Sequence, residues 1–440
     1  NGMKSSSKSQ AGSKRKFLIR ASEKGTKKKH SRLHQVLRGI GIAGGICIAL
    51  LFLSYLALAT WPVIGAQGSD LLRGLIGDKA VASLEMQFNQ MQDDVQKLKY
   101  HLGLEKPSVP WNPPQATTPI PLLTETLTST PEIQTQAVIQ PTTTLTVLNT
   151  PQPTATPKPT VWQPAPLTPL GTATEEGVWS AYIQDTAGYT VAYRTFLQPD
   201  PTRPYTLVAI VAIDLTRTRL HFVLGSIEPA GENTQPRSGA IPKTDRVANI
   251  LLAAFNGGFK GRHGEFGAMA DGIIALPPRE GIGTLVIYKS GQVNLEEWGP
   301  GSAITSDMDA FRQNGPLVIQ AGQINPRIHN NSPEDWGYTV NDVSPTVRTG
   351  VGLSMDAKTL FYFCGPSLSM EMLAKTMQAA GAWNAIQLDI NNYWALFVTF
   401  HPSGSNLIPE ALLPKLMIAN IERYLWDYTR DYFYITSIVR

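Results

Sequence analysis

The sequence predicts an α+β domain over residues 177–440, a mixed β-sheet with a few packed helices. Short apolar runs rich in β-branched and aromatic residues recur from about residue 205 to residue 438, and they have the length of strands. Two stretches have helical character, residues 370–380, which begin after the N-capping Ser369, and residues 409–424. Because these helices do not alternate regularly with the strands, the pattern favours α+β over α/β.

Ahead of this domain the chain changes composition several times, and its first segment, residues 1–38, is strongly basic. The segment holds twelve Lys or Arg residues and one acid, Glu23, which gives about +11; since the whole chain carries +4, the remainder carries about −7. A nucleic-acid-binding domain needs clustered positive charge on a folded surface. The pattern instead favours a solvated cytoplasmic arm against anionic lipid, and we predict no nucleic-acid partner.

Residues 39–61 predict a single transmembrane helix. The run from Gly39 to Ser69 carries no charge and is apolar through Ala59, which is long enough to span a bilayer. A cleaved signal peptide is the alternative, although its apolar region is normally only about 7–15 residues long. The basic residues before the span place the N-terminus in the cytoplasm. We therefore expect a single-pass cell-membrane protein with an extracytoplasmic C-terminal domain.

Residues 68–104 predict a coiled-coil stalk. Apolar residues recur at alternating spacings of three and four, which is the a/d pattern of a coiled coil: Val81, Leu84, Phe88, Met91, Val95, Leu98 and Leu102. In this register Asp94 occupies a g position and Lys99 the following e position, which suits an ion pair between two parallel chains. We expect a parallel homodimer through residues 81–102; the alternative is an amphipathic helix that packs on its own domain.

Residues 105–176 predict a Pro/Thr-rich linker. The segment has few charged residues and almost no aromatic ones, so it buries too little apolar surface to offset chain entropy. The two cysteines of the chain, Cys47 and Cys364, fall in the predicted membrane span and in an apolar run of the domain. They predict neither an intramolecular disulfide nor a zinc site.

Three short motifs in the domain suggest a chemistry when they are taken in order. They are Phe-Asn-Gly-Gly-Phe at residues 255–259, Arg-Thr-Gly-Val-Gly at residues 348–352 and Ile-Gln-Leu-Asp at residues 386–389. In this order they resemble the phosphodiester glycosidase family, over roughly residues 251–400. The resemblance implies a strand, hairpin, strand, helix, strand order and hydrolysis of a sugar-1-phosphodiester in an envelope glycan or polymer.

The resemblance places the first two motifs at the substrate. Gly257 and Gly258, next to Asn256, permit a close backbone approach, so their N–H groups form a candidate anion site; an ordinary turn is the alternative. Arg348, followed by Thr349, is the candidate phosphate clamp, because a guanidinium binds a phosphate through two parallel hydrogen bonds. The alternative is a structural arginine paired with a nearby aspartate.

Asp389 is the candidate catalytic carboxylate. A carboxylate at the end of a buried strand is unfavourable unless it is paired or used, so it could serve as general acid, nucleophile or metal ligand; a structural cap is the alternative. Glu265 and Asp271 are candidates for a second carboxylate, since glycoside hydrolysis usually employs two that lie about 5–10 Å apart. The sequence identifies no cofactor and leaves the metal requirement open.

The chain departs from the family immediately after Asp389. A glycine-rich loop with hydroxyls is typical there, whereas this chain has Ile-Asn-Asn-Tyr-Trp at residues 390–394. Asn391 can donate and accept hydrogen bonds, and Trp394 can stack on the face of a sugar. Two hypotheses follow, a glycosidase with a different substrate and a non-catalytic glycan-binding or scaffolding module on a dimeric stalk.

Overall fold

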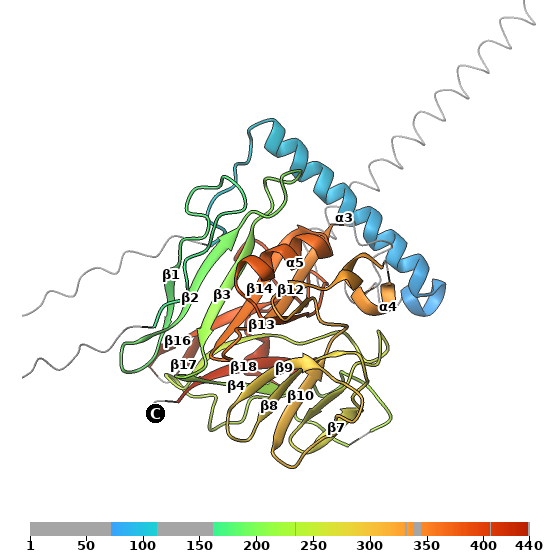
Figure 1. The fold of residues 1–440 in the computed structure, drawn as a ribbon, viewed down its shortest axis with the longest axis vertical. Coiled ribbons are helices and arrows are strands. Elements are labelled where there is room, and N and C mark those ends of the chain that lie inside the picture. The colour runs from blue at the N-terminus through green and yellow to red at the C-terminus, as the bar shows by residue number, and fades with distance from the viewer. Residues whose placement is uncertain are drawn as a thin grey trace, which may run out of the picture. The chain divides into compact units, whose positions relative to one another are not determined.

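The computed structural model describes residues 72–111, 162–233, 235–330, 332–337, 345–404 and 406–438. The chain divides into two compact units, one up to Asp78 and one from Lys79 onwards, and the second contains the predicted domain. The described part of that unit is built from three antiparallel sheets and few helices (Figure 1). This confirms a sheet-rich domain with few helices, but the strands form three antiparallel sheets instead of the predicted mixed sheet.

The largest sheet, called here the eight-stranded sheet, has the order β1-β2-β3-β14-β13-β15-β11-β12. Neighbouring strands are antiparallel throughout, and β13 lies between β14 and β15. The strand that carries Arg348 is thus beside the strand that leads to Asp389. The bounds are β1 Ser180–Gln184, β2 Thr190–Leu197, β3 Val208–Asp214, β11 Ile319–Gln320, β12 Gln323–Ile324, β13 Thr346–Leu353, β14 Thr359–Leu368 and β15 Asn384–Gln387.

Two five-stranded sheets complete the architecture. The central sheet has the order β17-β16-β5-β18-β4, and the small sheet has the order β7-β6-β10-β8-β9. The central sheet consists of β4 Thr218–Val223, β5 Leu251–Asn256, β16 Phe397–Ser403, β17 Asn406–Ala411 and β18 Tyr432–Ser437. The small sheet consists of β6 Ala268–Ala270, β7 Ile273–Leu276, β8 Gly283–Tyr288, β9 Val293–Glu297 and β10 Met308–Gln313.

The main core lies between the eight-stranded sheet and the central sheet. Phe255 of β5 stacks on Phe397 and Phe433 of the two flanking strands, with ring centroids 5.9 and 5.2 Å away. Successive side chains of a strand point to opposite faces. In β3, accordingly, Val211 belongs to this main core, whereas Ile210 belongs to a second core on the other face of the sheet.

Helix α5, Met370–Ala379, covers that other face of the eight-stranded sheet. The Ser369 hydroxyl accepts a hydrogen bond from the N–H of Met372 at 3.2 Å, which confirms the predicted N-cap. Two shorter helices are η1, Pro326–His329, and α4, Pro333–Trp336.

The predicted helix over residues 409–424 is wrong. Pro409 lies in β17 opposite Phe400, and turns follow that strand until the short helix η2, Arg423–Leu425. Leu412 and Met417 are buried in the main core. Their apolar spacing resembles that of a helix, but it arises because an irregular segment is packed against the sheet.

Helix α3, Asp78–His101, occupies the predicted stalk. It docks on its own domain through polar groups. The Asp93 carboxylate accepts hydrogen bonds from Arg203 Nε at 2.8 Å and from the Tyr205 hydroxyl at 2.9 Å, and Asn89 donates to the Thr346 hydroxyl at 3.3 Å. A helix is therefore confirmed here, whereas the pairing of two copies stays a prediction.

The N-terminal predictions are tested only in part. No helix in the described ranges is both long and apolar enough to cross a membrane. The predicted span at 39–61 lies outside the described residues, as do the basic tail and most of the linker. Both described ends of the linker pack on the domain, since the ring of Trp111 lies 6.0 Å from that of Phe196 and the ring of Trp162 lies 5.7 Å from that of Tyr193. The domain thus extends at least to Trp162.

Candidate active site

The first and third motifs meet at one small pocket. Its lining residues come from the end of β5, from the loop after β15, and from η2 and the segment between η2 and β18: Asn256, Gly257, Gly258, Asp389, Trp394, Tyr424, Tyr428, Arg430 and Asp431. Five of these residues are among the predicted site residues. The remaining four, all from residues 424–431, are not. A larger pocket between β1 and β16, lined by Tyr182, Thr399 and His401 among others, lies away from the motifs.

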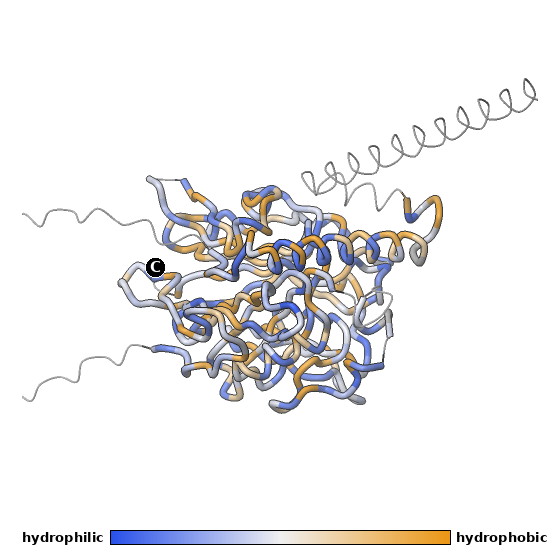
Figure 2. The backbone as a smooth tube through the Cα atoms, turned by 90° about the horizontal axis from the view of Figure 1, so that it is seen from above, coloured by the Kyte–Doolittle hydropathy of each residue, from blue (hydrophilic) through white to orange (hydrophobic). Residues whose placement is uncertain are grey.

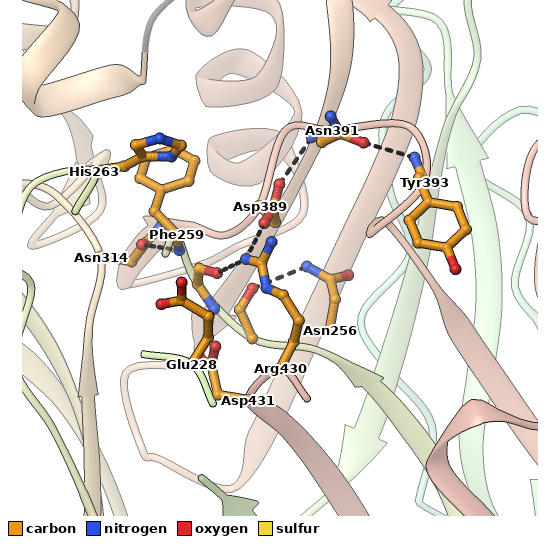
Figure 3. Close-up of polar contacts among 12 residues, drawn as sticks. Glu228, Asn256, Phe259, His263, Asn314, Asp389, Asn391, Tyr393, Arg430 and Asp431 are labelled. Atoms are coloured by element: carbon orange, nitrogen blue, oxygen red, sulfur yellow. Dashed lines mark hydrogen bonds and ion pairs between the residues drawn. The ribbon is translucent and has the colours of Figure 1, made fainter. Parts of the chain in front are cut away.

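Asp389 is the best-positioned carboxylate of this pocket. Its Oδ2 accepts a hydrogen bond from Arg430 Nη2 at 2.5 Å, and its Oδ1 accepts one from the N–H of Asn391 at 2.9 Å (Figure 3). Its backbone is fixed as well, because the Thr349 hydroxyl donates to the Asp389 carbonyl at 2.6 Å. The side chain is only 7 % exposed. Asp389 is therefore an oriented, nearly buried acceptor beside a cation.

Arg430 connects two of the motifs. The same Nη2 that binds Asp389 also donates to the Gly258 carbonyl at 2.8 Å, and the guanidinium lies 4.7 Å from the centre of the Trp394 ring. Burial alone would lower the pKa of Arg430, but the adjacent carboxylates of Asp389 and Asp431 outweigh it and raise that pKa. The pocket thus contains a permanent, oriented positive charge.

Asp431 accepts hydrogen bonds from the N–H groups of Gly257 and Gly258, which the sequence predicts as an anion-binding site. Its carbonyl accepts from the N–H of Gly257 at 3.1 Å, and its Oδ2 accepts from the N–H of Gly258 at 3.0 Å. The same Oδ2 is 2.8 Å from Arg312 Nε, in an ion pair whose side chains are at most 1 % exposed. The Gly-Gly turn therefore binds an anion of the protein itself.

The Asn256 side chain holds the end of β5 in place through hydrogen bonds to neighbouring strands. Its Nδ2 donates to the Thr349 hydroxyl and to the Gly257 carbonyl, both at 3.0 Å, while its Oδ1 accepts from the Tyr362 hydroxyl at 3.0 Å. These bonds join β5 to β13 and β14. The side chain lines the pocket, but its hydrogen-bonding groups serve the framework.

The loop after Asp389 is built without glycine by two overlapping side-chain turns. Asp389 Oδ1 accepts from the N–H of Asn391, and Asn391 Oδ1 accepts from the N–H of Tyr393 at 2.9 Å. Such local bonds let Asp and Asn form tight turns that glycine would otherwise supply. The consequence is that Trp394 is placed over Arg430, at the edge of the pocket.

The structure places the other predicted residues away from the pocket lining. Arg348 is fully buried and donates to the Leu368 carbonyl at 3.0 Å and to Gln387 Oε1 at 2.5 Å. Glu265 and Asp271 are exposed turn residues with positive φ of 49° and 53°. None of the three lines the pocket that contains Asp389.

Sequence reasoning missed all four lining residues from 424–431, and the two charged ones, Arg430 and Asp431, form the ion pairs of the pocket. They lie outside the three motifs, and only their position offers a signal: two adjacent opposite charges directly before the aromatic strand of residues 432–437. Since both side chains are almost completely buried, each must have a partner of opposite charge. Among the described residues, no group of three or more His, Cys, Asp or Glu could hold a metal ion.

Comparison with known proteins agrees with the three motifs. Residues 250–389 match the model of the phosphodiester glycosidase family, a range that begins just before the first motif and ends at Asp389. No curated protein matches the sequence.

Several solved structures are similar to the chain. The catalytic domain of zebrafish N-acetylglucosamine-1-phosphodiester alpha-N-acetylglucosaminidase, auto-inhibited by its pro-peptide, is 16 % identical; the match covers 60 % of this chain and 88 % of that one, with a TM-score of 0.37. A hypothetical protein from Synechocystis is 11 % identical, with coverages of 59 % and 62 % and a TM-score of 0.28. A Burkholderia pseudomallei protein described as exported is 12 % identical, with coverages of 53 % and 74 % and a TM-score of 0.26.

Proposed function

We propose, since residues 250–389 match the phosphodiester glycosidase family, that this domain hydrolyses a sugar-1-phosphodiester in an envelope glycan or polymer. One observation carries the proposal: the first and third motifs converge on a pocket that contains the buried Asp389–Arg430 pair. Such a pair offers an ionised carboxylate for the sugar and a fixed positive charge for the phosphodiester.

In this proposal Asp389 acts at the anomeric carbon or at the glycosidic oxygen. Arg430 replaces Arg348 as the phosphate-binding arginine, because Arg430 lines the pocket whereas Arg348 is bonded inside the sheet. A second cation is near, since Lys260 Nζ lies 5.8 Å from the centre of the Trp394 ring. The Tyr428 hydroxyl also lines the pocket and accepts a hydrogen bond from Arg423 at 3.2 Å, and burial raises the pKa of this phenol.

The test is an assay of the purified protein on a panel of sugar-1-phosphodiesters, with the free sugar and the phosphomonoester both quantified. We expect turnover by the wild-type protein and a loss of about 10³-fold in the Asp389→Asn variant, which keeps the shape of the side chain but removes its charge. Asp427→Asn, at an exposed aspartate outside the pocket, is the matched control and should retain activity. Equal rates in Asp389→Asn and wild type would count against the proposal.

A non-catalytic glycan-binding module is the second candidate. Both carboxylate oxygens of Asp389 already accept hydrogen bonds within the protein, and an aromatic loop replaces the glycine-rich loop that is typical of the family. Glycan binding that survives Asp389→Ala, is lost in Trp394→Ala and occurs without turnover would favour this function. Turnover by the wild type would exclude it.

Replacing Trp394 with alanine is expected to raise KM about tenfold and to change kcat little. The indole lines the pocket and is partly exposed, so it can stack on a sugar in both the ground state and the transition state. Trp383→Ala is the matched control, because Trp383 is 37 % exposed and lies outside the pocket. An unchanged KM in Trp394→Ala, measured by initial rates, would remove the indole from the substrate site.

We also propose that the domain is membrane-anchored and faces the extracytoplasmic side. The proposal rests on the uncharged apolar run at residues 39–61 and on the basic residues before it. Protease added to intact cells should remove the domain but spare the basic tail. Protection of the domain until the cells are lysed would contradict this orientation.

A further inference from the structure

Helix α3 has two faces of different character. The face that docks on the domain is largely polar and carries Asn89 and Asp93, together with the buried Ala82. The opposite face carries the apolar stripe of the heptad pattern, because residues two positions apart on a helix, such as Met91 and Asp93, are rotated by about 200°. Five stripe residues expose between 37 % and 62 % of their surface: Leu84, Met91, Val95, Leu98 and Leu102. Hydrophobic and hydrophilic positions alternate along the backbone of the molecule's long helix (Figure 2).

We infer that this stripe binds the same stripe of a second copy in a parallel two-stranded coiled coil. The inference is independent of the proposed hydrolysis. The alternative in which the stripe packs on its own domain does not describe the docked helix, since the domain contacts a different face. Two stripe residues differ in the single copy, since Val81 is buried and Phe88 is partly buried, so the interface begins at Leu84 and ends at Leu102.

The charges beside the apolar stripe favour a second copy in parallel orientation as its binding partner. Asp94, at a g position, and Lys99, at the following e position, are both exposed. Parallel strands in register bring each g side chain next to the e side chain of the other strand, which yields two symmetric Asp94–Lys99 pairs. Antiparallel strands would not align these two positions.

Docking on the domain makes so short a coiled coil feasible. Fewer than three heptads are marginal as isolated chains, because each copy must first become helical. Here Asp93, held by Arg203 and Tyr205, keeps α3 helical in the single copy, and preorganisation lowers the entropy that association must overcome. Because α3 is fixed to the domain, the dimer would hold two domains in a defined orientation.

Sedimentation equilibrium of the full chain in detergent tests the inference. We expect a dimer at tens of micromolar, and we expect Leu98→Glu to raise the dissociation constant about a hundredfold or more, since it places two like charges in the interface. Lys97→Glu, the adjacent exposed residue at a c position, is the matched control and should change it less than tenfold. Since residue 98 is exposed in the single copy, thermal unfolding should be the same in both variants at protein concentrations where both are monomeric.

Disulfide cross-linking tests the register in the same protein. In a Cys47→Ser background, Leu98→Cys should cross-link to its symmetric copy rapidly, whereas Lys97→Cys should do so slowly, because c positions of a parallel pair lie far apart. Cys364 is buried and should not react. A monomeric wild type, a dimer that Leu98→Glu leaves intact, or equal cross-linking at residues 97 and 98 would overturn the inference.

Discussion

Replacing Asp431 with alanine is expected to lower the free energy of unfolding by about 3–5 kcal/mol. The substitution leaves the Arg312 guanidinium, in a side chain only 1 % exposed, without its carboxylate. It also removes the acceptor for the N–H of Gly258, at the turn of the first motif. A buried charge that loses its counter-charge is strongly destabilising, even though Arg312 still donates to backbone carbonyls.

Thermal and denaturant unfolding of a graded series would measure this effect. Asp431→Asn keeps an oxygen for the N–H of Gly258, so it should lower the free energy of unfolding less than Asp431→Ala does. Asp427→Ala, at an exposed site in the same segment, should leave the free energy of unfolding within about 0.5 kcal/mol of the wild-type value. If Asp431→Ala and Asp427→Ala were equally stable, Asp431 would not be the partner that holds the Gly-Gly turn.

Replacing Arg430 with methionine is expected to lower kcat/KM by about 10²–10³-fold. The guanidinium binds Asp389 Oδ2 and the Gly258 carbonyl and lies beneath Trp394, so its loss removes the positive charge and releases the carboxylate from its orientation. Initial rates should be measured well below the unfolding temperature of the variant, because this change also leaves Asp389 without its buried partner.

Arg430→Lys separates charge from geometry. An ammonium group keeps the positive charge but lacks the planar, delocalised fork of arginine, so activity should lie between that of Arg430→Met and that of wild type. A purely structural role for Arg430 would lower stability and leave the rate per folded molecule unchanged in both variants, which would contradict the proposed site.

The parts of the fold that sequence reasoning found are those with local signals. Strand β5 is an almost continuous apolar run, β13 and β15 contain short apolar stretches at residues 350–353 and 385–386, and the N-cap of α5 is a single serine before a helical pattern. The helix prediction for residues 409–424 was wrong because their apolar residues have the spacing of a helix. Only the pairing of β17 with β16, which is a tertiary feature, shows that the segment starts as a strand.

The sequence predicts the part of the candidate site that comes from the first and third motifs, but not the part that comes from residues 424–431. The motifs locate Asn256, the two glycines and Asp389, because each follows a recognisable strand. Local sequence motifs do not predict Arg430, because its contact with Asp389 spans 41 residues and depends on where β18 pairs with β5. Arg348 was predicted as a phosphate-binding residue, but its side chain is used inside the fold. It suits a phosphate by residue type, but the adjacent strand supplies Gln387 as its internal partner.

In the proposed reaction, the pocket of Asp389 breaks the bond between the anomeric carbon and oxygen, rather than the bond between phosphorus and oxygen. Turnover of a sugar-1-phosphodiester in ¹⁸O-labelled water tests it directly, with mass spectrometry of both products. A glycosidase adds water at the anomeric carbon, so we expect the label in the released sugar and unlabelled phosphomonoester. Label in the phosphomonoester, with an unlabelled sugar, would show that water attacks phosphorus and would contradict the account.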